Sequence, residues 1–226
     1  MWITQINRGP FQNNLYLVGA DQGDECAAID PAWVVDELIA LAGSRGKRIT
    51  KILQTHGHID HAIGVQEMRR KTGAPVYGHP DEHRLFQEND ASFLEMIGVT
   101  WEPIVLDVEY RDGDTVLMGL RTDGTPDEFR IVHTPGHTPG GVCLVSDDFM
   151  VAGDTLFAGS VGRWDFPGGN GTQLFESIHT RLLTLPESLR FYPGHGPSST
   201  IGEEKRYNPY LQMSAAQLGV GQGKWM

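Results

Sequence analysis

Residues 55–61 read Thr-His-Gly-His-Ile-Asp-His, which places four side chains of metal-ligand type within six positions. The run before them, Ile49–Gln54, has the apolar character of a buried strand. A helical pattern follows from about Asp60 to Thr72, and Gly73 ends it. Loops at the ends of strands are where α/β proteins place functional side chains. We therefore interpret this stretch as a functional site at a strand-to-helix turn, not as a polar surface turn.

The side chains of this turn suit two cations. Alternate side chains of such a turn point in different directions, so His56 and His58 can hold one cation while Asp60 and His61 reach a second. Imidazole and carboxylate ligands together favour zinc, manganese, iron or cobalt over calcium or magnesium. We expect divalent metal ions at this turn, with zinc preferred and iron or manganese as the alternatives.

Three later loops repeat the same local setting, a ligand-type residue among glycines just after an expected strand. They are His137 in Thr-Pro-Gly-His-Thr-Pro-Gly-Gly, Asp154 in Ala-Gly-Asp-Thr and His195 in Pro-Gly-His-Gly. Glycine lets the backbone approach closely and lets a neighbouring side chain be aimed without a Cβ clash. With the first cluster, the loops supply five histidines and two aspartates. Such a set can fill two adjacent metal sites that share one carboxylate.

Strand and helix patterns alternate along both halves of the chain. The expected strands are Trp2–Asn7, Asn14–Val18, Cys26–Asp30, Ile49–Gln54, Ala74–Tyr77, Asp114–Met118, Phe129–His133, Val142–Val145, Phe149–Ala152 and Arg190–Tyr192. The expected helices are one that Pro31 opens and Gly43 closes, one over Asp60–Thr72 and one over about Thr172–Leu185. This alternation predicts an α/β fold. Two such halves meeting face to face would give a four-layer sandwich, although the alternation alone does not select that architecture.

The length and composition suit one ordinary globular domain. We expect residues 1–226 to form a single domain with a packed core, since 39% of the residues are hydrophobic and 21% are charged. No stretch approaches the ~18 consecutive apolar residues of a membrane helix. The N-terminus lacks the basic and apolar regions of a signal peptide. Cys26 and Cys143 are interpreted as packing thiols of a reducing compartment. These features predict a soluble, cytoplasmic protein with no membrane partner.

The charge balance disfavours nucleic acid as a partner. The net charge is −11, from 29 acidic and 18 basic side chains. Proteins that bind polyanions usually carry clusters of basic residues. Only Arg69–Lys71 and Lys205–Arg206 stand together here, and each is interpreted as a solvated helix face. We therefore expect a small-molecule substrate and no nucleic acid; the sequence makes no prediction of the oligomeric state.

With these motifs in order, the chain resembles the metallo-β-lactamase superfamily over essentially its whole length. Within it, Thr-His-Gly-His-Ile-Asp-His, Thr-Pro-Gly-His-Thr-Pro-Gly and Ala-Gly-Asp-Thr-Leu-Phe resemble the glyoxalase II (hydroxyacylglutathione hydrolase) branch. Gly162–Gly169, Pro193–Pro197 and Asn208–Pro209 look like the short bacterial form, which lacks the C-terminal helical domain of the long members. The resemblance implies the four-layer αββα sandwich.

The resemblance also implies roles for the ligand residues. It assigns His56, His58 and His137 to the first metal and Asp60, His61 and His195 to the second, with Asp154 bridging the two. The implied activity is hydrolysis of a thioester such as S-2-hydroxyacylglutathione by a metal-bridging hydroxide. Asp60, a ligand of the second metal, would also orient the hydroxide as the catalytic side chain. A thiolate leaves without a proton, so this reaction needs no dedicated general acid.

Substrate recognition is less constrained by the sequence. Arg163 falls where the family has a basic residue that contacts glutathione, but Asp165 stands in place of the family's tyrosine. A substrate contact and a structural Arg163–Asp165 ion pair both remain open, and so does the thiol half of the substrate. The segment Asp90–Pro103, with Phe93, Met96, Ile97 and Trp101, could overhang the site. Core packing is the preferred interpretation of these apolar residues.

Two other functions compete with thioester hydrolysis. One is a persulfide dioxygenase-like enzyme of the same fold, with a single iron held by His56, His137 and Asp154. The stretch Gly-Ser-Val-Gly-Arg at residues 159–163 lacks the cysteine typical of that group, which disfavours it. The other is a metal-binding scaffold without turnover. The complete ligand set argues against a scaffold, because degenerate members of such families lose ligands.

Overall fold

The computed structural model describes residues 1–89, 94–95 and 98–220, and the chain divides into two compact units. The first unit comprises Met1–Tyr110 and Thr115–Phe129. The second comprises Arg111–Asp114 and Arg130–Met226. The expectation that residues 1–226 form one domain stays a prediction.

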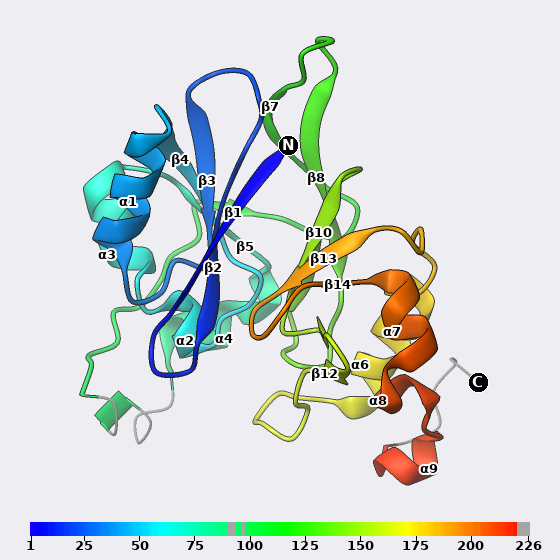
Figure 1. Ribbon diagram of the computed structural model, residues 1–226. Coiled ribbons are helices and arrows are strands. Elements are labelled where there is room, and N and C mark those ends of the chain that lie inside the picture. Colours follow the sequence, from blue (N-terminus) through cyan, green and yellow to red (C-terminus); the bar gives the residue numbers. More distant parts are fainter. Residues whose placement is uncertain (90–93, 96–97, 221–226) are drawn as a thin grey trace. The chain divides into compact units, whose positions relative to one another are not determined.

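The first unit is built on a six-stranded sheet with the strands in the order β1-β2-β3-β4-β5-β6 (Figure 1). Its strands are β1 (Trp2–Arg8), β2 (Asn13–Gly19), β3 (Glu25–Ile29), β4 (Arg48–Leu53), β5 (Val76–Gly78) and β6 (Val108–Glu109). The first three are antiparallel, and β3, β4, β5 and β6 are parallel. Its helices are α1 (Val35–Ser44), α2 (Ile59–Ala62), α3 (Val65–Thr72), η1 (Pro80–Glu82) and α4 (His83–Gln87). The parallel strands therefore direct their carboxyl ends to one edge of the sheet.

Burial explains why this sheet is stable. Every residue of β2 is buried, and α1 and α3 both contact β4 and lie side by side against the sheet (Figure 1). A strand that is covered on both faces takes a continuous apolar run in place of an alternating one. The core contains Leu17, Ile52 and Met68, each without solvent exposure. This packing fixes the strand ends from which the loops emerge.

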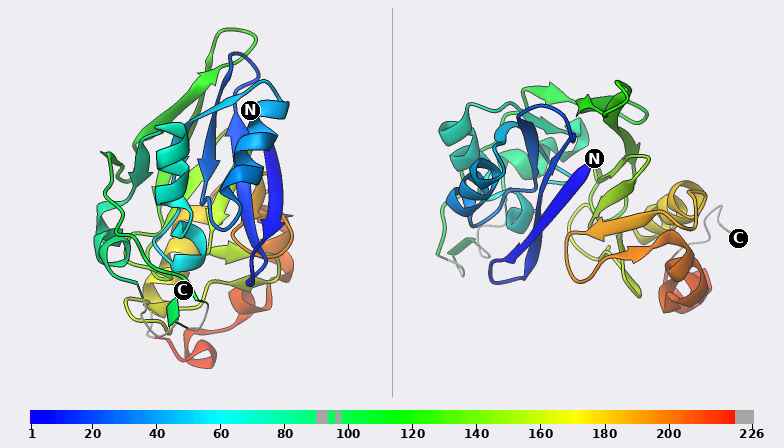
Figure 2. Two further views of the ribbon diagram at one scale, coloured as in Figure 1. Left: turned by 90° about the vertical axis from the view of Figure 1, so that its left-hand side faces the viewer. Right: turned by 45° about the horizontal axis from the view of Figure 1, so that its top comes forward.

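The second sheet has six strands in the order β14-β13-β10-β9-β8-β7, and the boundary between the units falls within β8. The remaining strands are β7 (Thr115–Leu120), β8 (Pro126–His133), β9 (Val142–Val145), β10 (Phe149–Gly153), β11 (Leu156–Phe157), β12 (Ser160–Val161), β13 (Arg190–Pro193) and β14 (Ser199–Thr200). The helices of the second unit are α6 (Gly171–Ser177), the π-helix η2 (Ile178–Leu182), α7 (Ile201–Tyr207), α8 (Pro209–Gln212) and α9 (Ala215–Leu218). Figure 2 shows α7 in orange to red beside this sheet, where it contacts β14. Strands β11 and β12 form a separate two-stranded sheet, and α8 contacts β12.

The predicted α/β class and the positions of the predicted strands are confirmed, but three helix predictions were wrong in extent. The helix expected from Pro31 begins only at Val35, because Asp30 and Trp33 have φ values of 49° and 63°, which a helix cannot accommodate. The helix expected over Asp60–Thr72 is two helices, α2 and α3. The helix expected over Thr172–Leu185 is α6 followed by η2, which ends at Leu182.

The chain packs closely at the break between α2 and α3. A Cβ atom on Gly64 would lie 2.2 Å from the carbonyl oxygen of Pro31. The chain after the first parallel strand therefore packs directly on the backbone of residue 64. This contact brings the segment after β3 against the segment after β4.

We expect Gly64→Ala to lower the free energy of unfolding by about 1–3 kcal/mol, because the added methyl group overpacks this contact. Gly43→Ala is the matched control. Gly43 lies in α1, is exposed and has no atom within 4 Å of an added Cβ, so alanine should stabilise the helix by about 0.5–1 kcal/mol. Urea unfolding followed by circular dichroism measures both. Equal effects of the two substitutions would contradict the steric argument.

Both cysteines are buried, which confirms the interpretation as packing thiols. Burial raises the pKa of the Cys26 and Cys143 thiols to about 11 each. Because the thiolate is the reactive form, we expect neither cysteine to react with a thiol-specific reagent at pH 8 in the folded protein. Both should react once the chain is unfolded in guanidinium. Rapid labelling of the folded chain at pH 8 would contradict this assignment.

Candidate metal centre

The ligand cluster of the first unit stands at the carboxyl edge of its parallel strands. His56 follows β4, and its ring centroid lies 4.9 Å from that of His58 and 4.2 Å from that of His61. The Asp60 carboxylate lies 3.7 Å from Nε2 of His61. His56 and His61 are buried, and His58 and Asp60 are partly buried. The structure thus brings together all four residues predicted from the Thr-His-Gly-His-Ile-Asp-His stretch.

A buried aspartate that sequence reasoning missed orients two of these rings. Oδ1 of Asp30 accepts from the Thr55 backbone N–H at 2.8 Å, and Oδ2 accepts from the Thr55 hydroxyl at 2.6 Å. The same Oδ2 lies 3.1 Å from Nδ1 of His61. Since the Thr55 proton is donated to Asp30, the Thr55 oxygen accepts from Nδ1 of His56, 3.0 Å away. These contacts assign the Nδ1–H tautomer to His56 and His61, with Nε2 as the coordinating nitrogen.

The second residue that sequence reasoning missed is Asn13, at the start of β2. Its side-chain amide donates to Oδ2 of Asp60 at 2.9 Å, and its oxygen accepts from the Trp33 indole N–H at 3.2 Å. Asn13 is 1% exposed. A buried amide with both ends bonded holds Asp60 in one orientation. Position alone could have pointed to Asp30, an acidic residue directly after an apolar strand, but no local signal marks Asn13.

The second unit brings its three predicted ligands together around Asp154. Asp154, His137 and His195 follow β10, β8 and β13, which run in the same direction, since β13 is parallel to β10 and β9 is antiparallel to both β8 and β10. Oδ2 of Asp154 lies 3.6 Å from Nε2 of His137 and 3.5 Å from Nε2 of His195. Asp154 and His137 are buried, and His195 is partly exposed.

These separations fit a metal ion better than direct hydrogen bonds. Two ligand atoms at about 2.0–2.2 Å from one tetrahedral ion are separated by roughly 3.4 Å. The observed spacings of 3.5 and 3.6 Å between Oδ2 of Asp154 and the imidazoles of His195 and His137 are close to that value. The same carboxylate oxygen of Asp154 thus faces both imidazoles. The donor set, made of imidazole and carboxylate only, also matches zinc, iron and manganese chemistry.

Arg163 contributes its backbone to this site. Its carbonyl oxygen lies 2.7 Å from Nδ1 of His137, and a carbonyl can only accept, so Nδ1 carries the proton and Nε2 is the coordinating atom. Its side chain forms two hydrogen bonds with Asp165, at 2.9 and 2.8 Å, and the guanidinium lies 4.2 Å from the centre of the Phe166 ring. The hydrogen bonds from Arg163 lower the pKa of Asp165. The structure therefore contains the ion pair that the sequence left open, and a substrate contact of Arg163 stays a prediction.

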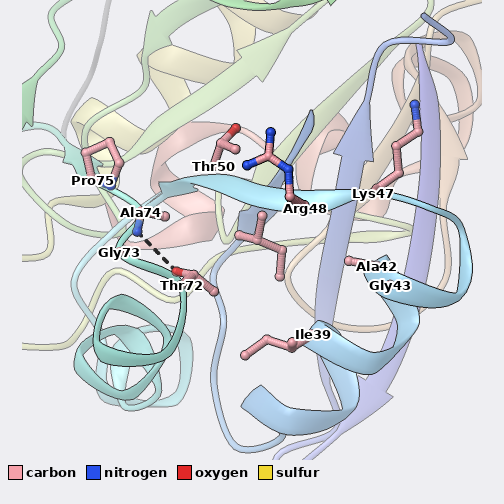
Figure 3. Close-up of a pocket in the computed structure, with 11 residues that line it drawn as sticks. Ile39, Ala42, Gly43, Lys47, Arg48, Thr50, Thr72, Gly73, Ala74 and Pro75 are labelled. Carbon is pink, nitrogen blue, oxygen red and sulfur yellow. Dashed lines mark hydrogen bonds between the residues drawn. The ribbon is translucent and has the colours of Figure 1, made fainter. Parts of the chain in front are cut away.

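A pocket of about 400 Å³ in the first unit belongs to a different part of the sheet. Lys47, Arg48 and Thr50 line it together with the ends of α1 and α3 (Figure 3). Figure 3 also shows the hydrogen bond from the Ala74 N–H to the Thr72 hydroxyl at its rim. The pocket lies at the amino end of β4, whereas His56 follows its carboxyl end. It is therefore separate from the histidine cluster.

The apolar segment expected between Asp90 and Pro103 is described only in part. Phe93, Met96 and Ile97 lie outside the described residues. Trp101 packs against the core of the first unit, and its indole N–H donates to the Phe86 carbonyl at 3.3 Å. Core packing is therefore confirmed for Trp101.

In the described part of the chain, no helix is long and apolar enough to cross a membrane.

Comparisons with known proteins agree with this arrangement. The sequence model of the metallo-β-lactamase superfamily matches residues 8–195. The probable metallo-hydrolase YqgX of Bacillus subtilis is 36% identical over 90% of this chain and 94% of its own length. The hydroxyacylglutathione hydrolase GloC of Haemophilus influenzae is 33% identical over 89% of this chain and 93% of its own length.

Solved structures share the fold. The B3 metallo-β-lactamase BLEG-1 matches with a TM-score of 0.81 at 33% identity, covering 94% of this chain and all of BLEG-1. TTHA1623 in a di-iron-bound form matches with a TM-score of 0.80 at 36% identity, covering 92% of this chain and 100% of that chain. ETHE1 from Myxococcus xanthus matches with a TM-score of 0.78 at 28% identity, covering 100% of this chain and 94% of that chain. The expected α/β sandwich fold is thereby confirmed, and the chain belongs to the metallo-β-lactamase superfamily.

Proposed function

We propose that the ligands of the two units complete one binuclear metal centre that hydrolyses thioesters, with S-2-hydroxyacylglutathione as the favoured substrate. The observation that carries the proposal is that side chains of both ligand sets are held in fixed orientations by hydrogen bonds. Each set stands at strand ends, and three imidazoles are fixed through Nδ1 by Thr55, Asp30 and the carbonyl of Arg163. Ligand histidines in metalloenzymes are oriented in this way.

Within the proposal, each ligand has a named role. His56, His58 and His137 hold the first metal, Asp60, His61 and His195 hold the second, and Asp154 bridges them. When bound, the metal pair lowers the pKa of a water molecule to about 7 and polarises the carbonyl that is attacked. Zinc is the preferred occupant, and the di-iron form of TTHA1623 supports iron as the alternative.

The chain's own residues then orient the reactants. Asp60 would accept a hydrogen bond from the attacking hydroxide and so orient it, and Asn13 keeps that carboxylate in place through a 2.9 Å hydrogen bond. Asp30 maintains the tautomers of His56 and His61. No general acid is required, because the thiolate of a thioester leaves unprotonated. The name of the Haemophilus influenzae relative, a hydroxyacylglutathione hydrolase, supports the glyoxalase II-like branch.

We also propose a cytoplasmic location.

The alternative is a mononuclear iron enzyme of the persulfide dioxygenase type, held by His56, His137 and Asp154. The structural match to ETHE1 supports keeping it. It leaves Asp60, His61 and His195 without a metal to hold, although Asn13 and Asp30 orient two of these three side chains. The oriented second ligand set therefore favours the binuclear hydrolase.

We expect protein purified without chelator to hold close to two metal ions per chain and to hydrolyse S-lactoylglutathione. Asp154→Ala should lose one or both ions and lower kcat/KM by more than the ~10–100-fold typical of outer residues of metal sites. Asp147→Ala, which removes an exposed carboxylate of the same unit, is the control and should behave like the wild type. Plasma mass spectrometry and a thioester assay measure both effects. Full metal and activity in Asp154→Ala would overturn the ligand assignment. One iron per chain, with oxygen uptake on glutathione persulfide and no hydrolysis, would establish the alternative.

We expect Arg163→Ala to raise KM for a glutathione thioester more than for an uncharged thioester, because glutathione carries carboxylates. Asp165→Asn is the matched variant, since it breaks the ion pair and leaves the guanidinium in place. If Asp165 competes with the substrate for Arg163, Asp165→Asn should lower KM for the glutathione thioester only. Steady-state kinetics on both substrates measure the difference. Equal effects on the two substrates would assign Arg163 to a structural role.

A further inference from the structure

Gly57, the residue between the first two ligand histidines, is held through its backbone N–H and carbonyl by the neighbouring η1–α4 segment. The backbone N–H of Gly57 donates to Oε2 of Glu82 at 2.7 Å. The carbonyl of Gly57 accepts from the side-chain amide of Asn89 at 3.1 Å, and that amide also donates to the Leu85 carbonyl at 3.2 Å. Glu82 ends η1, and Asn89 lies two residues after α4. Both backbone polar groups of Gly57, which belong to the two peptide units on either side of it, are thus bonded by side chains of the η1–α4 segment.

Glu82 is an unusual residue for this place. It is 1% exposed, and a buried carboxylate is costly unless it is hydrogen-bonded. Its Oε2 accepts from the Gly57 N–H at 2.7 Å, at the short end of the range for such hydrogen bonds. An apolar residue would pack there without the cost of a buried polar group. The placement of this acceptor on the Gly57 N–H therefore points to a role in fixing the loop.

The segment that carries Glu82 and Asn89 is anchored to the core. Phe86 is 1% exposed and belongs to the first core, and its carbonyl accepts from the Ile104 N–H at 2.8 Å. Nδ1 of His79 accepts from the Asp81 N–H at 3.2 Å and caps η1. Because Phe86 packs into the core from α4 and His79 caps the start of η1, the segment offers Gly57 a fixed support.

The loop also fits closely against this support. A Cβ atom on Gly57 would lie 2.8 Å from Cβ of Leu85 and 2.9 Å from Oε2 of Glu82. Only glycine lets the peptide approach near enough for both hydrogen bonds. The sequence His-Gly-His is therefore matched to Glu82 and Asn89, which follow 25 and 32 residues later.

We propose that Glu82 and Asn89 are positioning residues that clamp the Gly57 backbone and so set the 4.9 Å separation of the His56 and His58 rings. The proposal rests on the proposed function, in which these two histidines hold the same metal. Neither clamp residue belongs to the proposed ligand set. The clamp acts through the backbone, so its loss should loosen both imidazoles while the fold is retained.

Four variants test the clamp. Glu82→Ala and Asn89→Ala each remove one hydrogen bond, and Glu82→Gln keeps an oxygen that can accept from Gly57. Glu88→Ala, which removes an exposed carboxylate from the end of the same helix, is the matched control. Two readouts avoid the activity of the loaded enzyme: the exchange rate of the Gly57 amide proton in metal-free protein, by NMR, and the rate of zinc release to a chelator.

We expect Glu82→Ala to speed Gly57 amide exchange, and both alanine variants to release zinc about 10–100-fold faster than the wild type, the range for outer residues of metal sites. Glu82→Gln should recover most of the loss, and Glu88→Ala should match the wild type. If the wild type binds zinc normally and both alanine variants release it at the wild-type rate, the clamp is overturned and the proposed function is not. Equally fast release from Glu82→Gln and Glu82→Ala would show that the acceptor oxygen is not what matters, and would overturn it for Glu82. A wild-type chain that takes up no metal would overturn the proposed function together with the clamp.

Discussion

The buried carboxylate of Asp30 is the constraint on which the first half of the site depends. It is 2% exposed and accepts both the N–H and the hydroxyl of Thr55, which joins the end of β3 to the chain that leaves β4. Through Nδ1 it holds His61, and through the Thr55 hydroxyl it holds His56. Its positive φ turns the chain sharply after the strand and prevents a helix from starting there. Asp30 thus sets the path of the chain after β3 through its backbone, and the orientation and tautomer of the His56 and His61 rings through its side chain.

The same principle recurs with other partners. A hydroxyl fixes His56, a carboxylate fixes His61, and the peptide carbonyl of Arg163 fixes His137. In each case the partner engages Nδ1, which leaves Nε2 as the nitrogen that would coordinate a metal ion. Asn13 does the equivalent for Asp60. Under the proposed function, ligands that are oriented in advance would lower the cost of ordering when a cation binds, and the cation would offset the charge of Asp60 and Asp154.

The sequence pointed to the residues that cluster in each unit but missed the side chains that support them, and the reason is locality. His56, His58, Asp60 and His61 stand in one turn, so their shared chemistry is visible along the chain. Asn13 bonds Asp60 from 47 residues away, and no periodicity or spacing encodes that contact. Helix extents were wrong as well. The positive φ values of Asp30 and Trp33, which delay the start of α1, are not visible in the hydrophobic pattern. Arg163 drew attention for its charge, whereas its carbonyl is the group that contacts His137.

The proposed function requires that His56, His58, Asp60, His61, His137, Asp154 and His195 together hold one pair of metal ions. X-ray absorption spectroscopy of the zinc-loaded protein tests this most directly, because it reports the ligand atoms and any metal neighbour of each ion. We expect nitrogen and oxygen ligands with imidazole scattering and a metal–metal distance of about 3.5–4 Å. Sulfur ligation, or loaded metal with no second ion within that range, would contradict it.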